Sequence, residues 1–363
     1  MSDQPFPVLY VSGAHYDMGL QHGLQVVHLR PALLASIAAR QAQLEKDAPG
    51  PLFEKLVEDT AALLQQADPS IVAQIQGMAD GLAVPRETLL RYNLAPVLRD
   101  VYTTERRLQE GCTTWAAAAP VTADGAPILA KTRDYTQEHT PLQVVVRAEP
   151  ARGYRYTYLT SAGSPGVFVA GFNETGLSIV DTHVSSRDVG PGLPDYALAM
   201  HVLEQYDDVR SAIGYLGTMP RLGRNNVLLA DSSGDIVAFE MGHRQYAVLE
   251  ASNGFLVNTN HFNSRALRAM FVDTEPPALR GNTFQRYQRA SQALEAAAGR
   301  VDVAFAKKLM AHHAETLDAI CRHPSPQSDA STIAATIFLP RQRQMHVCLG
   351  QPCTAPYHIL SYL

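Results

Sequence analysis

Apolar residues recur at helical spacing along most of the first 111 residues of the chain. The pattern predicts a long helix from Tyr16 to about Gln43 and a second helix along the leucines between 52 and 64. Asp68 followed by Pro69 is an N-cap with proline in the first turn, and it begins a third predicted helix. A fourth begins at Pro85. We therefore expect a mostly helical N-terminal part.

After residue 111 the pattern changes to short apolar runs separated by turn residues, which is typical of strands. The run 123–126, Ala-Asp-Gly-Ala, predicts the first hairpin turn. The other predicted strand pairs are 143–147 with 154–160, 167–172 with 177–181, and 333–339 with 344–349. A meander is predicted at 226–230, 236–241, 245–250 and 254–258, and helices are predicted over 195–217 and 282–314. These elements predict the α+β class, with two antiparallel sheets stacked face to face and helices outside.

The composition argues against several classes of protein. Of the 363 residues, 46% are hydrophobic and 18% are charged, as in globular proteins. The net charge of -5, without a basic stretch, argues against nucleic acid as a partner. The N-terminus lacks the basic start and apolar run of a signal peptide, and no run of about 18 apolar residues predicts a membrane span. Four cysteines are too few for a disulfide scaffold, so we expect a cytoplasmic protein.

The histidines and the other cysteines show no metal-ligand spacing. Cys348 and Cys353 lie close together without a second ligand pair, and we interpret them as buried or incidental thiols rather than a zinc site. His312 and His313 are adjacent on a predicted helix and should point to different faces. We therefore predict no metal and no bound cofactor.

One tetrapeptide, Gly111-Cys112-Thr113-Thr114, lies where the helical pattern gives way to the strand pattern. If the chain breaks before Cys112, the new α-amine, with a pKa of about 7.7 to 8.0, can take the thiol proton. Gly111 has no Cβ, so the thiol can approach the preceding carbonyl, which the two threonine hydroxyls could polarise. The alternative is that Cys112 is a small buried hydrophobic residue at the start of a strand.

Downstream segments support the first interpretation. In chain order they are Lys131-Thr132-Arg133-Asp134-Tyr135, Gly171-Phe172-Asn173 and Thr259-Asn260-His261. Together with the tetrapeptide they resemble the isopenicillin N acyltransferase family (acyl-CoA:6-aminopenicillanate acyltransferase) of N-terminal-nucleophile hydrolases. Upstream, the segments 77–81 and 92–93 resemble the family's propeptide. The order and approximate spacing hold from about residue 8 to residue 352.

The resemblance implies a four-layer αββα sandwich that cleaves itself between Gly111 and Cys112 and needs no metal. Residues 1–111 would form a mostly helical propeptide, or α subunit, and residues 112–363 the catalytic β subunit. The two parts together would make one αββα unit. They would remain associated as a heterodimer after the cleavage.

The resemblance also implies roles for individual residues. Cys112 would be the nucleophile and its freed amine the base, with Asp134 holding that amine in place. The Asn260 side chain and the backbone N–H of Tyr135 would form the oxyanion hole, because a tetrahedral oxyanion needs fixed donors. Asn173 would orient the nucleophile.

Three of these residues also have a structural interpretation. Asp134 caps a turn, Asn173 occupies a turn because asparagine tolerates the left-handed conformation, and Asn260 satisfies backbone groups at a strand end. His261 is a further candidate for the base. We favour the amine because adjacent side chains on a strand diverge.

Two positions depart from the family's pattern. Lys131 stands three residues before Asp134, where related cysteine members often have arginine, so the charge is kept but the bidentate fork is lost. Thr332 stands near the last hairpin, where the penicillin acyltransferase has arginine. We treat Lys131, Thr114 and Thr332 as possible substrate-binding or supporting residues, and we expect a different substrate.

The sequence thus predicts a self-processing cysteine amidohydrolase that cleaves a small N-acyl amide through a thioester on Cys112. Hydrolysis is favoured because no phosphate site for coenzyme A is visible. An acyl-CoA-dependent N-acyltransferase, with acyl-CoA as co-substrate, is the second hypothesis. An unprocessed, non-enzymatic binding protein is the third.

Overall fold

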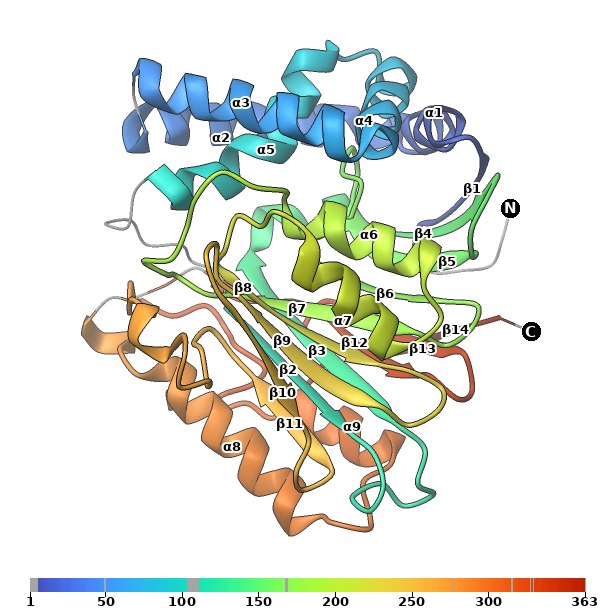
Figure 1. The fold of residues 1–363 in the computed structure, drawn as a ribbon, viewed down its shortest axis with the longest axis vertical. Coiled ribbons are helices and arrows are strands. Elements are labelled where there is room, and N and C mark those ends of the chain that lie inside the picture. The colour runs from blue at the N-terminus through green and yellow to red at the C-terminus, as the bar shows by residue number, and fades with distance from the viewer. Residues whose placement is uncertain are drawn as a thin grey trace.

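The structure is a computed structural model, which describes residues 6–48, 50–102, 111–166, 169–275, 277–314, 316–326, 328 and 330–362. The described elements form four layers in the order helices, sheet, sheet, helices, as Figure 1 shows from top to bottom. Three apolar cores lie between successive layers. The predicted α+β class and αββα sandwich are confirmed.

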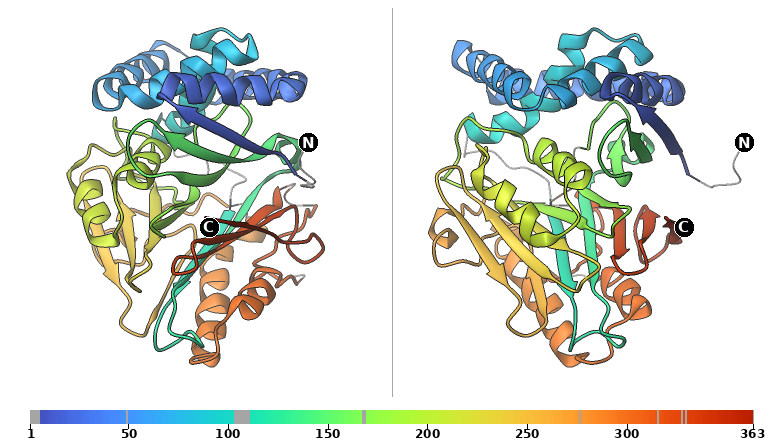
Figure 2. Two further views of the ribbon diagram at one scale, coloured as in Figure 1. Left: turned by 90° about the vertical axis from the view of Figure 1, so that its right-hand side faces the viewer. Right: turned by 45° about the vertical axis from the view of Figure 1, so that its right-hand side comes forward.

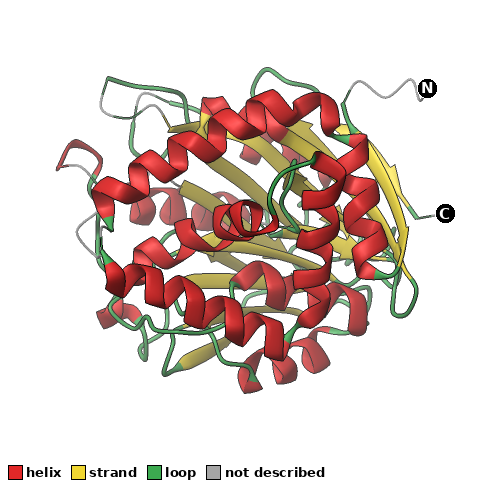
Figure 3. Cartoon of the chain, turned by 90° about the horizontal axis from the view of Figure 1, so that it is seen from above, coloured by secondary structure: helices red, strands yellow, loops and turns green. Residues whose placement is uncertain are grey.

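The first layer contains most of the N-terminal part. Its helices are α1 (His15–Gln25), α2 (Arg30–Asp47), α3 (Pro51–Ala67), α4 (Pro69–Leu82), α5 (Arg86–Tyr102), α6 (Asp195–Gln205) and α7 (Val209–Thr218). Seen from above, they lie across the strands (Figure 3). Asp68 caps α4 as predicted, since its carboxylate accepts a hydrogen bond from the N–H of Ile71 at 3.3 Å.

Two helices predicted as single are each divided. The first breaks at a short 3-10 turn, Val27–Leu29, after which Pro31 stands in the first turn of α2. The second breaks because Asp208 begins a new helix, α7, by accepting a hydrogen bond from the N–H of Ser211 at 2.9 Å.

The sheet beneath this layer has eight strands among the described residues, in the order β1-β4-β5-β6-β7-β8-β9-β10. Their bounds are β1 Val8–Gly13, β4 Gln143–Pro150, β5 Tyr156–Ser161, β6 Ala170–Asn173, β7 Ser178–His183, β8 Asn225–Ala230, β9 Ile236–Met241 and β10 Tyr246–Glu250. The sequence prediction missed β1, which pairs parallel with β4 while the other neighbours are antiparallel. The N-terminal part therefore supplies a strand as well as helices.

The second sheet has six strands among the described residues, in the order β11-β2-β3-β12-β13-β14. Their bounds are β11 Phe255–Asn258, β2 Gly111–Ala117, β3 Ile128–Thr136, β12 Ala330–Leu339, β13 Gln344–Leu349 and β14 His358–Ser361. The prediction that 254–258 completes a meander is wrong, because β11 leaves β10 and pairs with β2 in this other sheet. That crossing brings the residues after β11 beside the start of β2.

The last layer consists of α8 (Asn282–Ala296) and α9 (Val303–Met310), as predicted for 282–314. Trp115 of β2 is fully buried between this sheet and the two helices, in a core with Leu294 and Met310. Between the sheets, the rings of Phe172 and Phe338 lie 5.9 Å apart. Figure 2 shows the four layers from the side.

Candidate active site

Cys112 is the second residue of β2, and its side chain is 9% exposed. Strand alternation places it on the same face as Ala116, which lies in the core between the sheets. On one side β2 pairs with β3, but on the other side the pairing with β11 ends where Asn258 meets Thr114. Beyond that point the backbone of Cys112 needs other hydrogen-bond partners.

Two side chains supply those partners. The N–H of Cys112 donates to Asn260 Oδ1 at 3.2 Å, and its carbonyl accepts from Arg286 Nη1 at 2.6 Å. Arg286 Nη2 also donates to Asn260 Oδ1, at 2.6 Å. Because a guanidinium can only donate, this contact fixes which way the Asn260 amide faces. Both backbone groups of Cys112 are thus held by side chains.

The other end of the Asn260 amide is also occupied. Its Nδ2 donates to the carbonyl of His183 at 2.9 Å. The Asn260 amide nitrogen carries two hydrogens, so a second N–H remains to donate to an oxyanion, and the oxyanion-hole role stays a prediction. Tyr135, the predicted source of the second donor, is half-buried, and its ring lies edge-on to His139 at 4.5 Å.

The sequence reasoning missed Arg286, which is 1% exposed on α8. Its remaining bonds go to Thr113 Oγ1 at 3.0 Å and Asn282 Oδ1 at 2.7 Å. Burial, with the nearby cation of Arg322, lowers its pKa to about 10, so the group stays charged at neutral pH. The sequence signal that could have identified Arg286 is its position as a single cation on the buried face of the helix, four residues before Ala290.

Gly111 pairs with Asp134 in the β2–β3 register. A Cβ at position 111 would lie 2.9 Å from Asp134 Oδ2 and closer still to Arg322 Nη1. Gly111 is not among the described glycines with positive φ. Glycine is therefore needed for space rather than for an unusual backbone conformation.

Asp134 lies beside Gly111, at the predicted cleavage position, with a carboxylate that is only partly bonded. Oδ1 accepts from Thr332 Oγ1 at 2.6 Å, which makes Thr332 a supporting contact, and Arg322 N donates to the same hydroxyl at 2.8 Å. Oδ2 is buried without a hydrogen bond among the described residues and lies 3.9 Å from Arg322 Nη1. Burial raises the pKa of Asp134, and the cations Arg322 and Arg286 oppose that rise.

Lys131 contributes a buried charge beside the thiol. Its ammonium pairs with Asp181 and donates to the carbonyl of Val169 at 3.0 Å. Burial raises the pKa of the Cys112 thiol to about 12, although the charge of Lys131 acts in the opposite direction. The thiol is therefore protonated in the intact chain, and it needs a base before it can attack.

Asn173 lies away from this group. Its Nδ2 donates to the carbonyls of Leu203 and Tyr206, and its Oδ1 accepts from the N–H groups of Thr175 and Leu177. Asn173 lies near the first residues of β7, whereas the site lies near its last residues. The six residues of β7 span roughly 20 Å. The role in orienting Cys112 stays a prediction that these contacts do not support, because they use both ends of the amide. Thr114 also has a structural contact, to the carbonyl of Asn258 at 3.3 Å.

His183, at the end of β7, is the second residue that sequence reasoning missed. Its Nδ1 accepts from Arg224 at 2.8 Å, and burial together with that cation holds its pKa well below the ordinary value. The ring is therefore neutral with its proton on Nε2. With Asn260, His183 lines a cavity of about 30 Å³, which has room for a water molecule.

His261 does not act on the thiol in this arrangement. Its Nδ1 lies 2.9 Å from Thr283 Oγ1 and 3.1 Å from Thr259 Oγ1. Burial and the charge of Arg286 lower its pKa to about 4.

In the described part of the chain, no helix is long and apolar enough to cross a membrane.

The chain resembles one protein family in its sequence and several solved structures in its fold. The sequence profile of the acyl-coenzyme A:6-aminopenicillanic acid acyl-transferase family matches residues 121–354. Among solved structures, a variant of the conjugated bile acid hydrolase from Clostridium perfringens is 12% identical, covering 69% of this chain and 97% of its own, with a TM-score of 0.46. A penicillin V acylase from Agrobacterium tumefaciens is 16% identical, covering 69% and 86%, with a TM-score of 0.44. None of the curated proteins matches the chain.

Proposed function

Because the chain belongs to the acyl-coenzyme A:6-aminopenicillanic acid acyl-transferase family, we propose that it is a self-processing cysteine amidohydrolase. It cuts itself between Gly111 and Cys112 and then cleaves a small N-acyl amide. The observation that carries this proposal is the way the bond to be cut is held. Asn260 and Arg286 bind the two backbone groups of Cys112, and Gly111 lies against the Asp134 carboxylate.

The protonation state of the Cys112 thiol supports the proposal that cleavage must precede amide hydrolysis. The thiol of the intact chain has a pKa raised to about 12, so it carries its proton at neutral pH. Cleavage would turn the N–H of Cys112 into an amine with an ordinary pKa of about 7.7 to 8.0. Asn260 Oδ1 already accepts from that nitrogen, and the unbonded Asp134 Oδ2 lies beside Gly111, the residue that precedes it. The freed amine would be the base that the thiol lacks.

The reaction follows from these roles. The amine takes the thiol proton, and the sulfur attacks the carbonyl carbon of the amide substrate. The C–N bond breaks, the leaving amine takes a proton, and the acyl group remains on Cys112 as a thioester. A water molecule, deprotonated by the same amine, then releases the acid and restores the thiol.

The two fragments are proposed to stay together as a heterodimer after cleavage. Strand β1 pairs along its whole length with β4, and the helices α1 to α5 share one apolar core with that sheet. Separating residues 1–111 from residues 112–363 would expose this core to water.

Intact-mass spectrometry during incubation tests the proposal. We expect two masses that divide the chain between Gly111 and Cys112, with turnover of N-acyl amides appearing as the intact mass disappears. Cys112→Ala should remain intact and inactive, and Cys348→Ala should still be processed. A wild-type chain that stays intact, with Cys112 inert to thiol reagents, would instead support a non-enzymatic binding protein.

The name of the matched family favours a second candidate, an acyl-CoA-dependent N-acyltransferase. In that reaction the acyl group reaches Cys112 from a thioester, and an amine rather than water removes it. Product analysis with an acyl-CoA, with and without an amine acceptor, separates the two. A strict requirement for acyl-CoA would replace hydrolysis as the activity.

A cytoplasmic location is also proposed. Its support is that the four cysteines are all free thiols, which a reducing compartment preserves. Cell fractionation followed by detection of the chain tests it, and recovery from an oxidising compartment would contradict it.

A further inference from the structure

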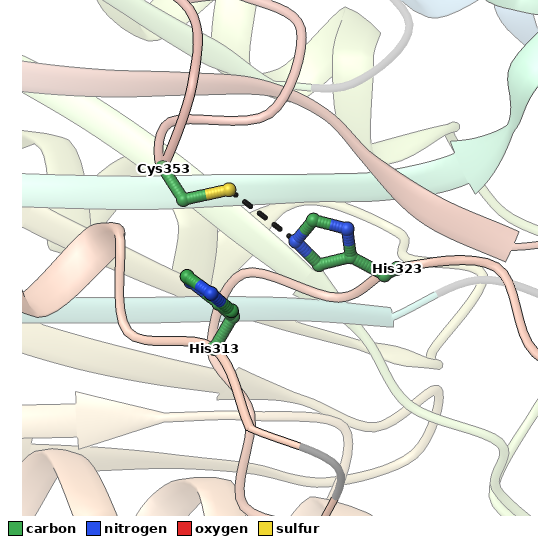
Figure 4. A group of neighbouring side chains, drawn as sticks. All are labelled: His313, His323 and Cys353. Atoms are coloured by element: carbon green, nitrogen blue, oxygen red, sulfur yellow. Dashed lines mark hydrogen bonds between the residues drawn. The ribbon is translucent and has the colours of Figure 1, made fainter.

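A cluster of soft ligands lies apart from Cys112, in the segments that follow α9 and β13. The ligand atoms of His313, His323 and Cys353 all lie within 4.8 Å of one another, as Figure 4 shows. Both histidines are exposed and Cys353 is half-buried, so solvent can reach the group. The three residues are far enough apart in the sequence that no spacing motif joins them.

Cys321 lies next to two members of this cluster. Its Sγ lies 3.6 Å from the Sγ of Cys353 and 3.9 Å from Nε2 of His323. The Sγ of Cys353 lies 3.3 Å from the same Nε2. The buried thiol of Cys321 thus lies beneath the Cys353 and His323 side of the cluster.

The three separations among Cys321, Cys353 and His323 fit tetrahedral zinc. Bond lengths of about 2.3 Å to sulfur and about 2.0 Å to nitrogen place two sulfurs about 3.8 Å apart and a sulfur and a nitrogen about 3.5 Å apart. The Cys321–Cys353 separation of 3.6 Å is close to the first value. The two sulfur–nitrogen separations, 3.3 and 3.9 Å, lie on either side of the second.

The surroundings orient the ligands. His313 Nδ1 donates to the carbonyl of Ala311 at 3.2 Å, which leaves the lone pair on Nε2, the arrangement typical of zinc-bound histidine. The carbonyl of His312 accepts from the N–H groups of Ile320 and Cys321, at 3.0 and 2.8 Å. These bonds hold the two arms of the loop together before any ion arrives.

We infer that His313, His323, Cys321 and Cys353 form a binding site for a divalent transition-metal ion, with Zn²⁺ as the preferred ion. Binding forms four metal–ligand bonds and releases the two thiol protons to solvent. No oxidant or reductant is needed. The inference does not depend on the proposed amidohydrolase activity.

The expectation that this chain has no metal site is revised for a physical reason. Cys353 and Cys348 are close in the sequence, but their thiols have different partners. Cys348 Sγ lies near the carbonyls of Gly350 and Ala355, whereas Cys353 Sγ lies near Cys321 Sγ. His313 is not helical, because α9 ends at Met310. The second ligand pair therefore comes from a distant segment that only the fold brings close.

The site would also fix the backbone around Arg322, which stands between the ligands Cys321 and His323. The N–H of Arg322 donates to Thr332, and its guanidinium lies beside Gly111 and Asp134. A bound ion would restrain this segment and thereby raise the melting temperature of the whole chain.

The test uses the full chain, treated with a chelator under reducing conditions and then titrated with Zn²⁺ or Co²⁺. We expect one ion per chain by elemental analysis, a thiolate-to-cobalt charge-transfer band, and a rise in Tm with Zn²⁺. His323→Ala, at an exposed position, should lose all three signals. His28→Ala, an exposed histidine in another layer, should keep them.

Two results would overturn the inference. One is metal uptake by His323→Ala equal to that of the wild-type chain. The other is a Cys321–Cys353 disulfide in the purified protein that, once reduced, takes up no metal. Loss of the cobalt band in Cys353→Ser, with the uncomplexed Tm unchanged, would support it further.

Discussion

Two buried turns of this molecule each depend on one asparagine, and they use it in different ways. In the β6–β7 turn, the Asn173 amide bonds only to neutral groups, which are four backbone groups and the hydroxyl of Thr175. After β11, the Asn260 amide bonds to a buried cation, to the backbone of a cysteine and to the carbonyl of His183. The first turn is joined to the end of α6 in the neighbouring layer, and the second connects three layers.

The contrast extends to what surrounds each turn. Near Asn260 the described structure keeps a buried carboxylate oxygen of Asp134 and a buried Nη1 of Arg322 without hydrogen bonds. Such groups are costly to bury, and they are tolerated where chemistry needs them. A candidate site is therefore recognised better by unsatisfied charge than by the presence of a polar side chain.

The strongest way to break the comparison is to remove the cation from the second turn. In Arg286→Met, Cys112 O and Asn260 Oδ1 each lose a charge-assisted hydrogen bond of about 1.5 to 3 kcal/mol. We expect processing and turnover to fall on the order of 10³-fold, with partial recovery in Arg286→Lys. Arg289→Met, on the same helix but paired with Asp318 at the surface, should change neither rate. If Arg286→Met and Arg289→Met lowered the two rates equally, Arg286 would have no specific role in processing or turnover.

Exchanging the two asparagines for alanine tests the comparison directly. Asn260→Ala should lower turnover on the order of 10²-fold, because the amine loses an acceptor at the reacting end. Asn173→Ala should leave kcat per folded molecule unchanged but lower the free energy of unfolding by about 2 to 4 kcal/mol, since several buried backbone groups lose their partners. Single-turnover kinetics and urea unfolding measure the two effects. The reverse pattern would contradict the assignment.

A methyl group at the cleavage position gives a smaller effect. In Gly111→Ala the new Cβ must displace Arg322 or the Asp134 carboxylate, so we expect self-cleavage to slow on the order of 10-fold. Gly214→Ala, at a helical position with open space around it, is the matched control and should process normally. Time-resolved electrophoresis measures both rates, and a normal rate in Gly111→Ala would show that the close approach is dispensable.

The last prediction concerns the stability of the protein in acid. Like Asn173, His22 is a buried neutral side chain that bonds to the backbone. His22 accepts from the N–H of Gly163 at 3.1 Å, and burial lowers its pKa to about 3 from an ordinary 6.5. Its contribution to stability is complete above pH 6.5 and is lost as the pH falls from 6.5 toward 3, because only the unfolded chain binds the proton there. His22→Gln should reduce the pH slope of the unfolding free energy by about 1.4 kcal/mol per unit in that window. An unchanged slope would mean that His22 titrates normally.

The sequence could predict the elements that local pattern controls. The helices and most hairpins follow from periodicity and turn residues, whereas the pairing of Cys112 with Asp134 was implied by the family resemblance. Strand β1 could not be predicted, because its partner β4 lies more than a hundred residues away. The same holds for β11, whose apolar run fits either sheet and whose pairing depends on the packed core.

Site residues divided along the same line. Asp134 and Asn260 lie in segments that resemble a known family, whereas Arg286 is one cation in an ordinary amphipathic helix. His183 had no pattern of its own, because its role depends on Arg224 and on a carbonyl that any residue would supply. Asn173 also lies in a segment that resembles the family, but its contacts are those of a turn away from Cys112. Long-range contacts, which no local spacing encodes, decide each of these cases.

The close fit of Gly111 against Asp134 and Arg322 gives maturation a direction. Cutting after Gly111 would convert a neutral amide into a carboxylate within a few ångströms of another carboxylate, in a place shielded from water. The guanidinium groups of Arg322 and Arg286 would then act on two anions, which repel each other at low dielectric. The new chain end would be pushed outward as soon as it forms. Self-cleavage would thus resist reversal without any second protein, because the product opposes its own return.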